Sequence, residues 1–145
     1  MTTGIHDHAK RLFLGGEVDL LGYPVRATLV DVGLHPIRLS EDRVIGDVPA
    51  AARVATVTLA NVRQQGGRMY ADDLFFQAVG RLDDERQVGM VLWVDRGGED
   101  STLICAWGAA GVGYVVDMWP LRVNGGDVRV AWGGNAILDV GVEEA

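Results

Sequence analysis

One stretch of the chain, residues 88–107, constrains the fold more than any other. Two apolar arms, rich in β-branched and aromatic residues, flank a polar turn at 95–101 that contains two consecutive glycines. Arms of this length joined by such a turn predict a β-hairpin. The first arm is apolar on both faces, with Met90, Leu92 and Val94 on one and Val91 and Trp93 on the other. We therefore expect the hairpin to lie inside a sheet that is covered on both sides.

The first 15 residues show the spacing of an amphipathic helix instead. The apolar stripe consists of Ile5, Ala9, Leu12 and Phe13, and Gly15-Gly16 follows it as a helix stop. A helix of about three turns is too short to be stable alone. Residues 1–15 are thus predicted to form a short N-terminal α-helix that packs on a sheet or serves as a docking arm.

Further strands are predicted where Val, Thr and aromatic residues alternate with polar ones between turn signals. The segments are 17–21, 25–32, 53–62, 68–70, 74–79, 114–118, 128–132 and 136–140, with one or two helical turns after a Ser40 cap at 39–45. In 25–32, Arg26 and Thr28 lie on the face opposite Val25. A chain of 145 residues without repeats or a linker predicts one domain over residues 1–145. The expected fold is mainly β, an antiparallel sandwich or partly closed barrel.

Charge and cysteine content argue against several classes of function. The net charge is −7 and the basic residues form no cluster, which disfavours nucleic-acid binding because phosphate contacts need clustered positive charge. Cys105 is the only cysteine, so no intrachain disulfide is expected. The N-terminus lacks the pattern of a secretory signal, and no apolar stretch is long enough to cross a bilayer. We expect a soluble protein made in the cytoplasm.

Candidates for catalysis or metal binding are few. His6 and His8 point to different faces of the predicted helix, so we interpret them as solvated histidines and not as a metal pair. Asp72-Asp73 and the acidic run 83–85 lack the ligand pattern of a calcium loop and are interpreted as turn caps. The glycines of 108–113 are in the wrong order for a dinucleotide loop.

Nucleophiles are equally unpromising. The two serines, Ser40 and Ser101, lie outside any Gly-x-Ser-x-Gly motif, and Cys105 belongs to an apolar arm where thiols are usually inert. We therefore predict no enzyme, no cofactor and no metal site. The four tryptophans, Trp93, Trp107, Trp119 and Trp132, are mostly explained by core packing. Because aromatic residues are enriched at protein interfaces, one or two of them are expected to be assembly contacts.

Several segments together resemble a family of small structural proteins of tailed bacteriophages, described as capsid, head-fibre or minor tail components. They are residues 12–20, 25–32, Ala52-Arg-Val-Ala-Thr-Val-Thr-Leu-Ala-Asn61, Tyr70-Ala-Asp-Asp-Leu-Phe-Phe-Gln-Ala-Val79, Leu92-Trp-Val-Asp-Arg-Gly97 and Val123-Asn-Gly-Gly-Asp-Val-Arg-Val-Ala-Trp132. The resemblance spans nearly the whole chain in collinear order, without a catalytic motif. The chain differs from the family at Gly97-Gly-Glu-Asp100, where a Thr-Gly-rich turn is usual.

The resemblance implies a virion protein, most of all a capsid decoration or head-associated protein that binds the major capsid protein and copies of itself. A minor tail, baseplate or fibre component is the alternative, and a carbohydrate-binding role would need an exposed Trp or Tyr beside acidic side chains. A small hydrolase is the least favoured. We expect assembly by apolar burial and edge-strand pairing in a symmetric oligomer, without nucleic acid or membrane. The expected contacts are Ile5, Leu12, Phe13, Tyr114 and Trp119, within the first helix and the segment 108–119.

Overall fold

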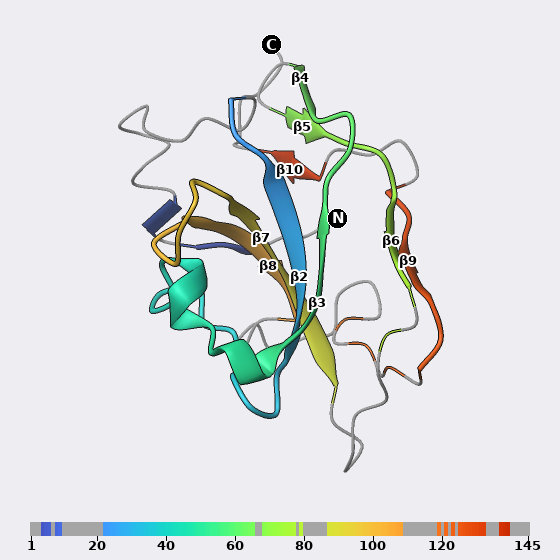
Figure 1. Cartoon of the computed structure of the whole chain (residues 1–145). Helices are drawn as coiled ribbons and strands as arrows, with labels where there is room; N and C mark the ends of the chain where they lie inside the picture. Colours follow the sequence, from blue (N-terminus) through green and yellow to red (C-terminus); the bar gives the residue numbers. More distant parts are fainter. Residues whose placement is uncertain are drawn as a thin grey trace.

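A computed structural model of the chain describes residues 4–6, 8–9, 22–65, 68–77, 79, 87–108, 119, 121, 123, 125–132 and 137–139. The fold of this part is mainly β, with antiparallel sheets, as predicted. The described strands form three separate sheets and do not close a barrel (Figure 1). None of the described helices is long and apolar enough to cross a membrane.

The largest sheet has five strands. Their order is β1 (Gly4–Ile5), β8 (Leu103–Trp107), β7 (Val88–Val94), β2 (Val25–Asp31) and β3 (Arg53–Thr58). A second sheet pairs β10 (Leu138–Asp139), β5 (Arg68–Tyr70) and β4 (Arg63–Gln65), and a third pairs β6 (Leu74–Phe76) with β9 (Val128–Val130). Two short 3-10 helices, η1 (Ile45–Asp47) and η2 (Ala50–Ala52), lie between β2 and β3 along the chain.

The predicted hairpin is confirmed and lies in the middle of the large sheet. β7 and β8 pair antiparallel, with Met90 opposite Trp107 and Leu92 opposite Cys105. In the turn Gly97 has a φ of 98°, a left-handed conformation that favours glycine. The other side of β7 pairs with β2 along its whole length. Because β7 is paired on both sides, none of its backbone groups lies at an edge of the sheet.

Both faces of the hairpin are buried, also as predicted. Met90 and Leu92 pack in a large cluster with Phe76 and Trp132, which belong to the smaller sheets and their loops. On the opposite face, Val91 packs in a second cluster formed mainly by the connection from β2 to β3. The buried residues of this second cluster are Val30, Ile37, Ile45, Val48, Ala52, Val91, Leu103 and Ala106. The large sheet is therefore the central layer of the described structure.

The N-terminal prediction needs correction. Gly4 and Ile5 form β1, opposite Ala106 and Cys105 of β8, so Ile5 belongs to a strand and the predicted helix start is wrong. The physical reason is that β8 is apolar and needs a partner for its outer backbone groups, which β1 supplies. Only His8 and Ala9 of the predicted helix are described as helical, and residues 10–21 lie outside the described residues.

Other boundaries also differ from the sequence prediction. The strand expected over 53–62 ends at Thr58, and Asn61 has a φ of 57° that breaks the extended backbone before β4. The turn expected near 39–45 is a single turn in which the Asp42 amide donates to Arg38 O over 2.9 Å. Its capping acceptor is the Asp42 carboxylate and not Ser40. The strand expected at 114–118 lies outside the described residues.

Candidate functional site

The predicted contact residues do not come together on a described surface. Ile5 is half-buried against the large core cluster, and Trp119 is only 6% exposed within it. Trp119 thus packs in the core of the described structure, and the contact role expected of these residues stays a prediction. Leu12, Phe13 and Tyr114 lie outside the described residues.

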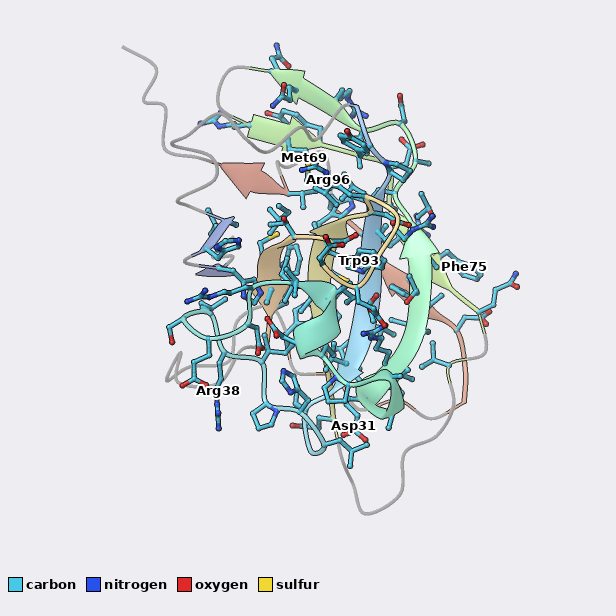
Figure 2. All side chains as sticks on the ribbon, turned by 60° about the vertical axis from the view of Figure 1, so that its left-hand side comes forward. Asp31, Arg38, Met69, Phe75, Trp93 and Arg96 are labelled. Atoms are coloured by element: carbon cyan, nitrogen blue, oxygen red, sulfur yellow. The ribbon has the colours of Figure 1, made fainter. Side chains whose placement is uncertain are left out.

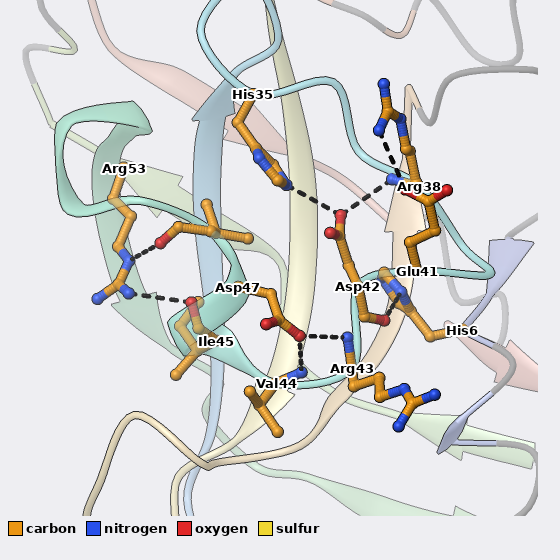
Figure 3. A network of polar contacts seen from close by, with 11 residues as sticks. His6, His35, Arg38, Glu41, Asp42, Arg43, Val44, Ile45, Asp47 and Arg53 are labelled. Carbon is orange, nitrogen blue, oxygen red and sulfur yellow. Dashed lines mark hydrogen bonds and ion pairs between the residues drawn. The ribbon is translucent and has the colours of Figure 1, made fainter.

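His6 is fully buried, so its interpretation as a solvated histidine is wrong. Its Nδ1 lies 2.8 Å from the backbone oxygen of Asp42, and its own amide donates to Ile104 O over 2.9 Å (Figure 3). The residue therefore ties the segment after β1 both to β8 and to the loop after β2. Such a contact joins positions 36 residues apart and cannot be seen in local spacing.

The Asp42 carboxylate is the centre of this network. Its Oδ2 lies 3.0 Å from His35 Nε2 and accepts from the backbone amide of Arg38 over 2.9 Å, while the residue is only 5% exposed. Because its hydrogen bonds are directed at the loop itself, the cluster orders residues 35–42 on the sheet. None of the residues in this network is a Ser, Thr or Cys, so it lacks a nucleophile for a His–Asp pair to activate.

A second set of contacts holds η1 and η2 against the sheet. The Asp47 carboxylate accepts from the backbone amides of Arg43 and Val44 over 2.8 and 3.1 Å. Arg53, at the start of β3, donates to the backbone oxygens of Ile45 and Val48 over 2.9 Å each. The same guanidinium pairs with Glu99 of the hairpin turn at 3.0 Å. These contacts fasten the loop, β3 and the turn to one another.

The remaining candidates for chemistry have structural roles. Cys105 is fully buried in β8, and loss of water around it raises the pKa of its thiol far above the usual value. The Ser101 hydroxyl donates to Gly98 O over 2.7 Å and accepts from the Arg96 amide, which closes the hairpin turn. Within the described part of the chain, no three His, Cys, Asp or Glu side chains are grouped to hold a metal.

The acidic pair at 72–73 anchors β9 and Trp132, which follows this strand. Asp73 accepts from the backbone amide of Trp132 over 2.9 Å and from Arg129 over 3.2 Å. These hydrogen bonds, the backbone one above all, lower the pKa of the Asp73 carboxyl. The backbone oxygen of Asp72 accepts from Trp132 Nε1 over 3.1 Å.

A row of polar and aromatic side chains crosses one face of the large sheet. Thr58 of β3 lies opposite Arg26 of β2, which in turn lies opposite Trp93 of β7. Arg26 Nη1 donates to Thr58 Oγ1 over 2.5 Å, and its Nε donates to Asp95 Oδ2 over 2.6 Å. Arg26, Thr58 and Asp95 therefore hold one another in place. Figure 2 labels Trp93, the β7 residue of this row.

A second row lies beside the first. Trp93 Nε1 donates to Thr28 Oγ1 over 2.9 Å, and Thr28 Oγ1 lies 2.9 Å from Thr56 Oγ1 of β3. Trp93 is the only residue of β7 that is not fully buried. We refer to Arg26, Thr28, Thr56, Thr58, Trp93 and Asp95 together as the polar face. It is the part of the described sheet where hydroxyl, charged and aromatic groups are held side by side.

The polar face ends at β3, an edge strand of the large sheet. β3 is the last strand in the sheet order, and none of the described strands pairs with its outer side. The amide of Leu59 donates to Val25 O over 2.8 Å, and Val57 lies opposite Ala27. Because inward and outward backbone groups alternate along an antiparallel strand, those of Thr56 and Thr58 point away from β2.

The sequence held one signal for the polar face, the alternation that placed Arg26 and Thr28 on the side opposite Val25. Their approach to Trp93, 65 residues beyond Thr28, depends on the pairing of β2 with β7 and is invisible without it. Comparisons with family models, with curated proteins and with solved structures give no match to this chain. The polar face and the edge strand β3 are the candidate functional surfaces of the described structure.

Proposed function

We propose that this protein is a structural component of a tailed-bacteriophage virion, a capsid decoration or head-associated protein that binds neighbouring copies of itself. The collinear resemblance described above supports this assignment to the virion. The structural observation that carries the proposal is that β3 ends the sheet, with no described strand paired to its outer side, so that a second chain can add a strand there.

The composition of β3 favours such pairing. The strand Arg-Val-Ala-Thr-Val-Thr is rich in β-branched residues and contains neither Lys nor Pro, the residues that usually block edges. Its single charge, on Arg53, is bound within the chain by two backbone oxygens and Glu99. The outward amide and carbonyl groups of Thr56 and Thr58 are then the hydrogen-bonding groups that a partner strand meets.

The geometry also limits how far the pairing extends. Leu29 lies opposite Ala55 while Val30 lies opposite Arg53, so Val54 is an extra residue that forms a bulge. A bulge twists an edge strand and interrupts its ladder, which confines pairing to 55–58. An edge this short buries less area than a stable dimer needs. Weak self-association suits a shell on which each copy is also held by the underlying lattice.

Replacing Thr56 with Pro tests the edge directly. The substitution removes an amide that points away from β2, so no hydrogen bond of the large sheet is lost. Each pair of chains loses two hydrogen bonds of about 1 kcal/mol each, so the dissociation constant should rise by about tenfold or more. Sedimentation velocity over a range of concentrations measures the change.

Two further variants make this result specific. Thr56→Ala removes the hydroxyl but keeps the amide, and should self-associate like the unmodified protein. Val57→Pro removes an amide that faces Ala27 and should instead lower the stability of the fold. A monomeric unmodified protein at high concentration, or equal association of Thr56→Pro and Thr56→Ala, would contradict the proposed use of the β3 edge.

The assignment to the virion has its own test. Particles of the phage that encodes this chain are purified, their heads and tails are separated, and each fraction is analysed by quantitative mass spectrometry. The chain should be present in many copies per particle in the head fraction. Its presence in tails alone would contradict the head assignment, and its absence from both fractions would overturn the virion proposal.

A further inference from the structure

We infer that the polar face binds a neutral oligosaccharide, with Trp93 stacking on a sugar ring and Arg26, Thr58 and Asp95 contacting its hydroxyl groups. This function is separate from self-association, because it uses side chains on the face of the sheet and not the backbone groups at its edge. The inference rests on the partial accessibility of Trp93, on the fixed polar groups around it and on their balanced charge.

Trp93 differs from the other tryptophans that the structure describes. Trp107, Trp119 and Trp132 are between 3% and 6% exposed, whereas Trp93 is partly accessible on a strand that is otherwise buried. Its one polar atom, Nε1, already donates to Thr28. The rest of the side chain is carbon surface at a fixed orientation. Part of it packs against the second cluster, and the accessible part suits the C–H face of a sugar ring.

The neighbouring groups supply donors and acceptors that are held ready. Arg26 uses Nε and Nη1 for Asp95 and Thr58, and its Nη2 has no partner among the described residues. Thr58 Oγ1 accepts from Arg26, so its own proton is directed elsewhere, and the side chain is exposed. Polar groups already fixed by internal hydrogen bonds lose little conformational entropy when a ligand binds.

Within the polar face the charges balance, which favours a neutral ligand over an anionic one; the nearby Arg96 lies over the Tyr23 ring and has no ion pair among the described residues. The charge of Arg26 is matched by Asp95 at 2.6 Å, and that of Arg53 by Glu99 at 3.0 Å. The whole chain carries a net charge of −7. Phosphate or sulfate groups bind best to cations that have no other partner. Sugar hydroxyl groups can both donate and accept, so they can also bind to charged side chains that are already paired.

The size of the polar face fits a short oligosaccharide. From Thr58 on β3 to Trp93 on β7 the row crosses two strand spacings, about 10 Å. An exposed aromatic residue lies at the end of the same strands: Tyr23 is 42% exposed, and the Arg96 guanidinium lies 5.1 Å from its ring centre. The amide of Asp95 donates to Pro24 O over 2.8 Å, which holds the two segments together.

A glycan array tests the inference. The purified protein is applied to an array of neutral bacterial oligosaccharides that also contains sialylated, sulfated and phosphorylated glycans, and the bound glycans are then titrated by calorimetry. We expect binding to neutral glycans. Trp93→Ala should weaken it by about tenfold or more, as for a central aromatic contact. Thr58→Val, which keeps the shape but removes the hydroxyl, should weaken it by about threefold or more.

Controls separate binding from folding and from self-association. Phe75→Ala removes another exposed aromatic side chain, 49% exposed on β6, and should leave glycan binding unchanged. Trp93→Ala keeps the β3 edge and should self-associate normally, so each proposal can fail without the other. If Trp93→Ala does not fold, Thr58→Val decides. Three results would overturn the inference: no glycan binding, binding of anionic glycans alone, or binding by Trp93→Ala and Thr58→Val that is as strong as that of the unmodified protein.

Discussion

The ionisation of the Asp95 carboxyl group is coupled to its hydrogen bond with Arg26 on the polar face. Its pKa is held below the usual value of 3.8, first by the hydrogen bond from Arg26 and then by the backbone amide of Gly97, although burial acts in the opposite direction. A carboxyl whose folded pKa is lower than its unfolded pKa stabilises the fold above the unfolded value. That stabilisation is lost as the pH falls through the folded pKa.

This direction predicts an acid-dependent difference between the unmodified protein and Asp95→Asn. The free energy of unfolding should be higher in the unmodified protein at pH 6, because only the carboxylate pairs with the Arg26 charge. The difference should shrink as the pH falls below 3.8. Urea unfolding at a series of pH values measures it. A difference that is the same at pH 6 and well below 3.8 would show that the ionised pair does not contribute.

At this scale the sequence identifies candidate residues but not their partners. Cys105 was correctly predicted to lie in a buried arm, because its neighbours along the chain are apolar. His6 was misread, since the oxygen that its ring contacts belongs to Asp42 on another segment. Which of the four tryptophans is partly accessible could not be predicted for the same reason: the partial burial of Trp93 depends on which strands lie beside it.

Among the strands, β7 contains a glycine where a larger residue has no room. A Cβ on Gly89 would lie 2.7 Å from Trp107 O and 2.7 Å from Ile37 Cδ1. The first of these atoms is backbone within the paired hairpin and cannot move aside cheaply. Gly89 therefore permits the close approach of β8 and of the loop after β2.

Gly89→Ala is accordingly expected to destabilise the fold by about 1–3 kcal/mol, the usual cost of overpacking a core. Chemical denaturation with a fit to the unfolding midpoint measures the loss. A suitable control is Gly125→Ala, because nothing lies within 4 Å of its Cβ position and only the positive φ of 88° opposes the change. A stability of Gly89→Ala equal to that of the unmodified protein would contradict the close approach.

Element types were predictable where the apolar pattern was long. The hairpin and strands β2 and β3 follow from runs of β-branched residues, and β9 from alternation after a glycine turn. β4 was missed because Arg63–Gln65 is polar and exposed throughout. β1 was missed because its two residues are strand only by pairing with β8, a contact that helix-like spacing cannot reveal.

For the whole molecule, the order of strands predicts how protection from solvent is distributed. Strands β2 and β7 are buried along most of their length and paired at both edges, whereas β4 is exposed and lies at an edge. Hydrogen exchange followed by NMR should show the slowest amides in β2, β7 and β8 and fast exchange in β4. The amides of Thr56 and Thr58 should exchange fast in dilute solution and more slowly as the concentration rises.

That concentration dependence also bears on the proposed self-association. Protection of Thr56 and Thr58 that does not change with concentration would contradict pairing through β3. The sheet order itself could not have been predicted, because β2 lies beside β7 and β1 beside β8 across long stretches of intervening chain. Local sequence patterns predict which segments are strands, whereas packing of the two core clusters on the faces of the sheet determines which strands become neighbours.

The pairing of β1 with β8 has a consequence for synthesis on the ribosome. Ile5 emerges early, but Cys105 opposite it is translated about a hundred residues later. β1 can therefore pair only after nearly three quarters of the polypeptide has been synthesised, and its backbone groups have no partner on β8 until then. Nascent chains halted before the hairpin has left the exit tunnel should hence remain accessible to chaperones that recognise extended apolar segments.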